Sequence, residues 1–318
     1  MRFLKPKFWE NKSDIIANLL RPISLLFYII TTLKKSLINS RKFKIPVICV
    51  GNIYVGGTGK TPISIMIANS LELKKKNPVI IKKYYKAHSD EQKMLYEKTK
   101  NLILKRNRVQ AIEKAEKENF NVAILDDGFQ DYTVKKDLNI ICFNSKQLIG
   151  NGFVFPAGPM REDISSLKRA QIIIINGKKD EAFEKDILEI SKNIKIFYSK
   201  YLPKNIEQFK NKKLFAFAGI GNPENFFELL SSYKLDVKKK INFPDHYDFK
   251  NKEIDLMIEN AIKNNYELIT TEKDYYRIKD LGFKKIGYLK VEVEIEEKDK
   301  LINELMKYLW LKLLNIFL

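Results

Sequence analysis

The chain has 318 residues, and its 45% hydrophobic and 12% aromatic content excludes an intrinsically disordered protein. Its two cysteines, Cys49 and Cys142, lie in separate apolar runs with no Cys-x-x-Cys and no neighbouring histidine. This pattern argues against a disulfide framework or a cysteine metal site, and it fits a reducing cytosol. The formal net charge of +19 favours an anionic partner, which could be a nucleic acid, an acidic membrane surface or a phosphorylated substrate.

The first predicted element is an apolar helix in a basic N-terminal segment. The first 44 residues carry ten lysines and arginines against two acidic residues, and residues 15–37 are mainly apolar. The longest uncharged run, Pro22 to Leu33, is too short to span a bilayer, and no small-residue cleavage site follows it. We expect residues 1–43 to lie in the surface of an anionic membrane, with a helix packed on the domain as the alternative.

A phosphate-binding turn is predicted next. Residues 45–50 form an apolar run typical of a buried parallel strand, and residues 63–73 have helical spacing. The glycine-rich segment between them lets backbone amides and a helix N-terminus surround an anion. The predicted cradle consists of Gly56, Gly57, Thr58, Gly59, Lys60 and Thr61. Lys60 can reach the β- and γ-phosphates and the Thr61 hydroxyl can bind Mg²⁺, so we expect the chain to use ATP or GTP.

Strand-like and helical runs then alternate, which predicts a parallel sheet wrapped by helices. After the cradle, strands are expected at 78–81, 102–104, 122–125, 139–143 and 172–176, and a helix at 109–118. Residues 195–213 have the pattern of a crossing between two halves. A second unit is expected to contain strands at 214–218, 268–271 and 286–295 and helices at 222–230 and 252–264.

The predicted fold is therefore α/β, a doubly wound and mainly parallel sheet resembling that of P-loop NTPases, with an N-terminal membrane-associating helix. Three parts are expected: the helical segment 1–43, a nucleotide-binding core 44–200, and a smaller C-terminal α/β unit 201–318 that completes the active-site cleft. Residues 301–318 are apolar with two lysines, and they form either a closing helix or a second membrane contact.

Two carboxylates, Asp126 and Asp127, stand where the apolar run 122–125 ends. In doubly wound sheets the ligand lies at the carboxyl ends of the strands, so we expect both acids to meet the cradle. One of them would hold Mg²⁺ directly or through water. The alternative is that Asp-Asp-Gly is simply a favourable turn.

Three further polar clusters follow at 155–162, 243–247 and 270–274. Together with Val-Gly-Asn at 50–52, Gly-Gly-Thr-Gly-Lys-Thr-Pro at 56–62 and Asp-Asp-Gly-Phe-Gln at 126–130, this ordered series resembles the tetraacyldisaccharide 4'-kinase family of lipid A biosynthesis. The resemblance covers about residues 45 to 277, and the basic apolar N-terminus is similar to that family's membrane-associating segment.

The resemblance implies transfer of the γ-phosphate of ATP to the 4'-hydroxyl of a lipid A disaccharide-1-phosphate precursor, at the cytoplasmic face of the inner membrane. The implied cofactors are ATP and Mg²⁺, and the chain would be peripheral or monotopic. Carried over by motif, the metal residues would be Thr61, Asp126, Asp127 and Glu162, and the substrate-binding residues Arg161 and Gln130. Lys60 would serve the transferred phosphate.

The resemblance also implies a pair of residues for the sugar hydroxyl. Ser89-Asp90-Glu91 is similar to the family's Gly-Asp-Glu element, and Asp245-His246 to its Asp-His turn. We therefore expect Asp90 to be the catalytic base, with His246 paired to it. Three positions depart from the family pattern: residues 82–85 read Lys-Lys-Tyr-Tyr in place of Ser-Arg-Gly-Tyr, Asp131 replaces a common histidine, and Tyr54 replaces a smaller residue.

Two other classes of protein remain as alternatives. A P-loop GTPase or metallochaperone switch would need a guanine-reading Asn-Lys-x-Asp, and the nearest string has Glu272 in place of the asparagine. A nucleic-acid-binding ATPase is suggested by the net charge, but a lysine-rich composition explains that charge equally well and no nucleic-acid module is recognisable. We expect no nucleic-acid partner.

Overall fold

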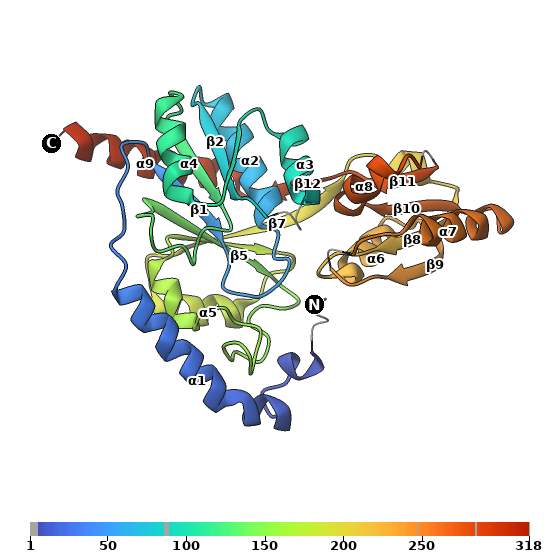
Figure 1. Ribbon diagram of the computed structural model, residues 1–318, viewed down its shortest axis with the longest axis horizontal. Helices are drawn as coiled ribbons and strands as arrows, with labels where there is room; N and C mark the ends of the chain where they lie inside the picture. The colour runs from blue at the N-terminus through green and yellow to red at the C-terminus, as the bar shows by residue number, and fades with distance from the viewer. Residues whose placement is uncertain (1–5, 86–88, 246, 284, 318) are drawn as a thin grey trace. The chain divides into compact units, whose positions relative to one another are not determined.

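The structure is a computed structural model that describes residues 6–85, 89–245, 247–283 and 285–317. These residues form two compact units, each with its own sheet (Figure 1). The larger unit holds residues 6–84, 98–200 and 293–317, and the smaller unit holds residues 85, 89–97 and 201–292. The predicted boundary at 200 coincides with the passage from the larger to the smaller unit. Residues 293–317, however, cluster with the larger unit, and residues 89–97 cluster with the smaller one.

The larger unit is built on an eight-stranded sheet in the order β12-β7-β6-β5-β1-β4-β2-β3. Every neighbouring pair from β7 to β3 is parallel, which confirms the predicted doubly wound sheet. Its strands are β1 (Val47–Gly51), β2 (Pro78–Lys83), β3 (Leu102–Lys105), β4 (Val122–Asp126), β5 (Leu138–Asn144), β6 (Ile172–Asn176), β7 (Lys195–Pro203) and β12 (Val291–Ile295). The first part of residues 195–213, predicted as a crossing between the two halves, is strand β7. Its alternate residues Phe197 and Ser199 are buried where it pairs with β6.

Helices cover both faces of this sheet. The core cluster on one face contains side chains of α4 and α5, while α2 packs against β1, β2 and β4 and adds none of its buried residues to that cluster. The helices of the larger unit are α1 (Ile15–Ser36), α2 (Lys60–Leu73), α4 (Arg108–Lys117), α5 (Glu181–Ile190) and α9 (Lys298–Phe317), with short 3-10 turns η1 (Lys7–Glu10) and η3 (Ile164–Arg169). The central strands are buried along their whole length, as parallel strands between helices must be.

The smaller unit is a four-stranded parallel sheet in the order β11-β10-β8-β9, with an apolar cluster on each face. Its strands are β8 (Lys213–Ala218), β9 (Asp236–Asn242), β10 (Glu267–Thr271) and β11 (Ile286–Leu289). Its helices are α3 (Ser89–Lys98), α6 (Pro223–Ser232), α7 (Asn251–Lys263) and α8 (Glu272–Ile278), with η4 (Ile206–Phe209) and η5 (Lys279–Leu281). The second α/β unit that the sequence predicts is thus confirmed.

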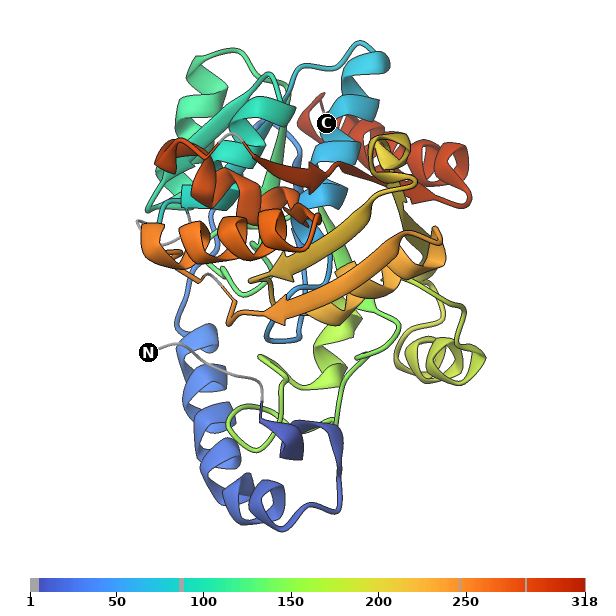
Figure 2. The same cartoon turned by 90° about the vertical axis from the view of Figure 1, so that its right-hand side faces the viewer.

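Helix α1 lies outside the sheet layers of the larger unit, as Figure 1 and Figure 2 show. Asp14 caps its first turn by accepting from the amides of Ile16 and Ala17. Most of its large apolar side chains are exposed, including Leu19 at 73% and Leu26 at 58%. Among the described residues α1 is the one helix long and apolar enough to cross a membrane, judged by length and composition only. The helix extends beyond the uncharged run 22–33. It includes Arg21 before that run and Lys34 and Lys35 after it.

Candidate active site

The phosphate cradle occupies the turn between β1 and α2, where the sequence predicts it. Gly59 is the residue before the first helical turn and has φ of 88°, a left-handed conformation that a side chain would oppose. Lys60 and Thr61 open α2, so the unpaired amides of the first turn face the cradle. The six predicted cradle residues therefore form one continuous loop and helix start.

Asn52 holds this loop in shape. Its side-chain amide is buried and donates to the carbonyl of Tyr54 at 2.7 Å and to the Thr58 hydroxyl oxygen at 3.0 Å. Gln130 in turn donates to the Asn52 carbonyl at 2.9 Å. Sequence reasoning missed Asn52 as a site residue, although a buried polar residue directly after a strand is the signal that could have found it.

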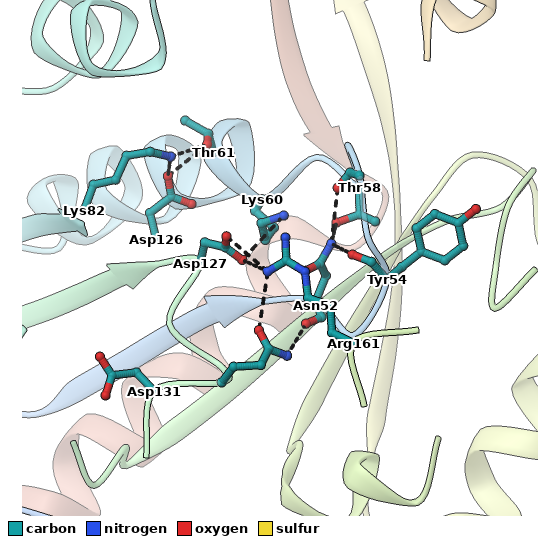
Figure 3. Close-up of polar contacts among 12 residues, drawn as sticks. Asn52, Tyr54, Thr58, Lys60, Thr61, Lys82, Asp126, Asp127, Asp131 and Arg161 are labelled. Atoms are coloured by element: carbon teal, nitrogen blue, oxygen red, sulfur yellow. Dashed lines mark hydrogen bonds and ion pairs between the residues drawn. The ribbon is translucent and has the colours of Figure 1, made fainter. Parts of the chain in front are cut away.

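Asp126 and Asp127 lie at the end of β4, beside the cradle, and they have different partners (Figure 3). Asp126 is fully buried and accepts from the Thr61 hydroxyl at 2.9 Å. Asp127 lies 3.6 Å from the Lys60 ammonium and accepts from Arg161 at 3.0 Å. Burial acts to raise the pKa of Asp127, but the charges of Lys60 and Arg161 outweigh burial and hold that pKa well below its usual range. Asp127 is therefore a carboxylate at every physiological pH.

The loop 155–162 brings Arg161 to the cradle. The Arg161 amide donates to the Ile53 carbonyl at 2.7 Å, and the Val55 amide donates to the Pro159 carbonyl at 2.8 Å. These two bonds fix the loop against the segment that follows β1, so the guanidinium reaches Asp127 and, at 3.4 Å, the amide oxygen of Gln130. The two predicted substrate-binding residues, Arg161 and Gln130, are thus in contact.

Glu162 lies in a different environment from the other predicted metal residues. Its Oε2 accepts from Lys35 of α1 at 2.7 Å, from Arg169 at 2.6 Å and from the Tyr132 hydroxyl at 2.6 Å. Burial acts to raise the pKa of Glu162, but Arg169 and Lys35 outweigh it and lower the pKa below its ordinary value of 4.5. The carboxylate ties the end of α1 to the loop that carries Arg161.

The N-terminal segment is joined to the same loop at two further points, one in η1 and one in α1. The Trp9 indole donates to the Pro156 carbonyl at 3.1 Å, and the Ala157 amide donates to the Ser24 hydroxyl oxygen at 2.9 Å. Sequence reasoning did not place Lys35 at the site, because nothing in the pattern predicts a contact 127 residues away.

We predict that Glu162→Gln lowers the free energy of unfolding by about 2 kcal/mol at pH 7, since hydrogen bonds to a charged group are lost. The folded pKa lies below the unfolded value, so the stabilisation is complete above about pH 4.5 and is lost as pH falls through the folded pKa. Urea denaturation from pH 3 to 7 measures the difference. The exposed Glu181→Gln is the control, and an equal difference at pH 3 and pH 7 would contradict the assignment.

Asp131, one of the departures from the pattern of the resembled family, has a clear partner. It accepts from the buried Arg108 at 3.2 Å, while the same guanidinium donates to the carbonyls of Asp126 and Asp127 at 3.2 and 2.7 Å. Arg108 therefore fixes the backbone that carries both acids.

The described residues next to the predicted base and its partner belong to the smaller unit. His246 and the Asp90 side chain lie outside the described residues, although the Asp90 backbone belongs to α3. Their neighbours are connected within this unit by Lys273 of the Thr-Glu-Lys-Asp motif. Its ammonium lies 3.0 Å from Glu91 and 3.4 Å from Asp245. The turn before His246 and the helix that carries Asp90 are thus joined through one cation.

The residues beside the cradle fit a nucleotide-borne magnesium ion. Within the described residues no group of three or more His, Cys, Asp or Glu side chains could hold a metal, so a site made only of protein ligands is not found there. Mg²⁺ usually takes one or two protein oxygens together with water and phosphate oxygens. The Thr61 hydroxyl, bonded to the buried Asp126 carboxylate at 2.9 Å, is such a pair.

Comparison with known proteins gives consistent matches over nearly the whole chain. The family model described as LpxK, tetraacyldisaccharide-1-P 4'-kinase, matches residues 16–309. A tetraacyldisaccharide 4'-kinase of Pelagibacter ubique is 42% identical, with 96% of this chain and 98% of that protein covered. One from Rickettsia akari is 33% identical over the same shares. The crystal structure of LpxK from Aquifex aeolicus in complex with ATP has a TM-score of 0.71 and 25% identity, covering 93% of this chain and 100% of that one.

Proposed function

The chain belongs to the tetraacyldisaccharide-1-P 4'-kinase family, and on this premise we propose that it transfers the γ-phosphate of ATP to the 4'-hydroxyl of a tetraacyldisaccharide 1-phosphate, a lipid A precursor. The observation that carries the proposal is the cradle with Lys60 and Thr61 beside Asp126 and Asp127, in a chain matched to this family from residue 16 to 309.

The larger unit supplies the groups that bind and neutralise the donor phosphates. The amides at the start of α2 bind the phosphate oxygens. The ammonium of Lys60 can stay close to the negatively charged γ-phosphate while it is transferred. Arg161 adds a planar, permanently charged donor at the same place. In the absence of nucleotide, the negative charge of Asp127 holds the Lys60 ammonium and the Arg161 guanidinium in place.

Thr61 and Asp126 are the residues that would hold Mg²⁺. When bound, Mg²⁺ neutralises charge on the β- and γ-phosphate oxygens. The buried Asp126 also fixes the orientation of the Thr61 hydroxyl by accepting its hydrogen bond, so that the oxygen lone pairs are left for the metal.

Asp90 would take the proton of the acceptor hydroxyl as that oxygen attacks the γ-phosphorus. The bond from phosphorus to the bridging oxygen of ATP breaks, and ADP leaves with that electron pair. His246 would orient the Asp90 carboxylate. The link from Glu91 through Lys273 to Asp245 supports this pairing, since it connects the chain neighbours of both residues.

The guanine-nucleotide switch receives no support from the site. Asp274 corresponds in sequence to the aspartate of a guanine-reading Asn-Lys-x-Asp, but its carboxylate is fully buried and accepts from the Gly219 amide at 2.9 Å and from Arg277 at 2.7 Å. Those bonds use the oxygens that a base would need. The ATP complex of the similar crystal structure also favours ATP.

For the location of the enzyme, we infer a peripheral or monotopic attachment of α1 to the cytoplasmic face of the inner membrane. The exposed apolar side chains of α1 support this inference, as does the exposed Lys34 at its end, which suits anionic headgroups. The residues that would enter the membrane are Ile15, Ile16, Leu19, Ile23, Leu25, Leu26, Ile29, Ile30 and Leu33.

We predict that the double variant Leu19→Glu and Leu26→Glu binds anionic vesicles at least about 100-fold more weakly, because burying one leucine side chain contributes about 1.5–3 kcal/mol. Co-sedimentation with vesicles containing phosphatidylglycerol measures the change. Leu73→Glu, which alters an even more exposed leucine at the end of α2, is the control. Equal binding by the double variant and the control would contradict attachment through α1.

The proposed reaction is tested with two acceptors in detergent micelles, one with a free 4'-hydroxyl and one with a methyl ether at that oxygen. With ATP labelled at the γ-phosphate, label should enter the first lipid and not the second. Label in both lipids would place the transfer at another oxygen, and label in neither would contradict the proposed function.

A further inference from the structure

Lys82 is a buried lysine that the proposed mechanism does not use. It lies near the end of β2, which pairs with β3 and β4 inside the sheet, and only 6% of it is exposed. In the parallel pairing of β2 with β4, the register sets Lys82 opposite Asp126. The lysine and the acid therefore stand side by side at the carboxyl edge of the sheet, next to the cradle.

The ammonium of Lys82 contacts both oxygens assigned to Mg²⁺. Its Nζ lies 2.6 Å from Asp126 Oδ2 and 3.4 Å from Thr61 Oγ1, and these two oxygens are themselves 2.9 Å apart (Figure 3). Because the Thr61 hydroxyl donates to Asp126, a lone pair of Thr61 is left for the ammonium. A single positive nitrogen thus faces the pair of oxygens expected to face the metal.

The other cations around the two acids have different partners. Lys60 and Arg161 pair with Asp127, and Arg108 donates to the main-chain carbonyls rather than to the Asp126 carboxylate. Asp126, with no exposed surface, needs a positive partner when it is ionised, and Lys82 provides it.

We propose that Lys82 is a built-in cation of the metal subsite, which holds Thr61 and Asp126 in position in the nucleotide-free protein and is displaced when a divalent cation arrives with the nucleotide. The inference rests on the proposed ATP chemistry for its biological meaning, but it concerns only cation binding. The flexible four-carbon stem allows Nζ to turn toward the phosphates while the backbone of β2 stays in place.

Two consequences follow from competition between one ammonium and one divalent cation for the same oxygens. The nucleotide-free site is already neutralised at Asp126, so the protein binds free divalent cations weakly. Removal of the ammonium leaves the two oxygens to the metal, so metal affinity should rise. It also removes a positive charge near the phosphates, so the affinity for metal-free ATP should fall.

The test uses Lys82→Met, which keeps the length of the side chain without its charge, and Lys82→Gln, which keeps a donor for Asp126 if the first variant does not fold. Mn²⁺ binding to the nucleotide-free protein is measured by electron paramagnetic resonance. The affinity of a fluorescent ATP analogue is measured with EDTA and across a Mg²⁺ titration. Lys83→Met, on the opposite face of the same strand, is the control.

We expect the Lys82 variants to bind Mn²⁺ at least fivefold more tightly than the wild type, to reach half-saturation with nucleotide at a lower Mg²⁺ concentration, and to bind nucleotide several-fold more weakly in EDTA. Unchanged or weaker Mn²⁺ binding would overturn the inference. Tighter Mn²⁺ binding in a protein that binds no ATP would support the inference and contradict the proposed function, so the two can fail separately.

Discussion

Replacing Lys60 by alanine is expected to lower kcat/KM for phosphate transfer by about 1,000-fold, the order of magnitude for removing one group that stabilises charge in the transition state. The Lys60 ammonium stands at the start of α2, 3.6 Å from Asp127, and no neighbouring side chain can move into its place without losing its own bonds: Arg161 is held by Asp127 and Gln130. Transfer of labelled phosphate under single-turnover conditions measures the loss.

Lys74→Ala is the matched control for this prediction. Lys74 is exposed and lies just after the last turn of the same helix, away from the cradle. If the Lys60→Ala protein has the same fold by circular dichroism and transfers phosphate as fast as the control, Lys60 takes no part in the reaction.

The second large effect is expected for the acceptor side of the reaction. Asp90→Asn and His246→Ala should lower turnover by about 100- to 10,000-fold, the range for loss of general base catalysis, while ATP affinity stays within about twofold. Measured separately, kcat and the dissociation constant of ATP distinguish a base from a nucleotide ligand.

Asp248→Asn provides the control, because Asp248 is an exposed acid two residues after His246. A double variant of Asp90 and His246 should lose little more than Asp90→Asn alone if the two act as a pair. Weaker ATP binding with unchanged turnover would show instead that these residues serve the nucleotide, and the assignment of Asp90 as the base would be abandoned.

Much of the fold could be predicted because its signals are local. The apolar run before the cradle, the glycine turn and the helical spacing after it lie within 29 residues, and the structure has β1, the turn and α2 in that order. Asp126 and Asp127 follow a buried strand, and the rule for strand ends brings them to the cradle as predicted.

The unpredicted features depend on contacts between distant segments. The pairing of Lys82 with Asp126 requires the register of β2 against β4, and the link from Lys35 to Glu162 joins residues 127 apart. No periodicity in the chain encodes either contact. The composition of residues 293–317 likewise does not reveal that α9 belongs to the larger unit, since a helix with an apolar side could cover either sheet.

The most direct test of the proposed kinase reaction is transfer from ATP labelled at the γ-phosphate to a tetraacyldisaccharide 1-phosphate in micelles, with wild-type protein and Lys60→Ala side by side. We expect a labelled lipid with a second phosphate for the wild type and about 1,000-fold less for the variant. No labelled lipid from wild-type protein that still binds ATP, or equal product from both proteins, would contradict it.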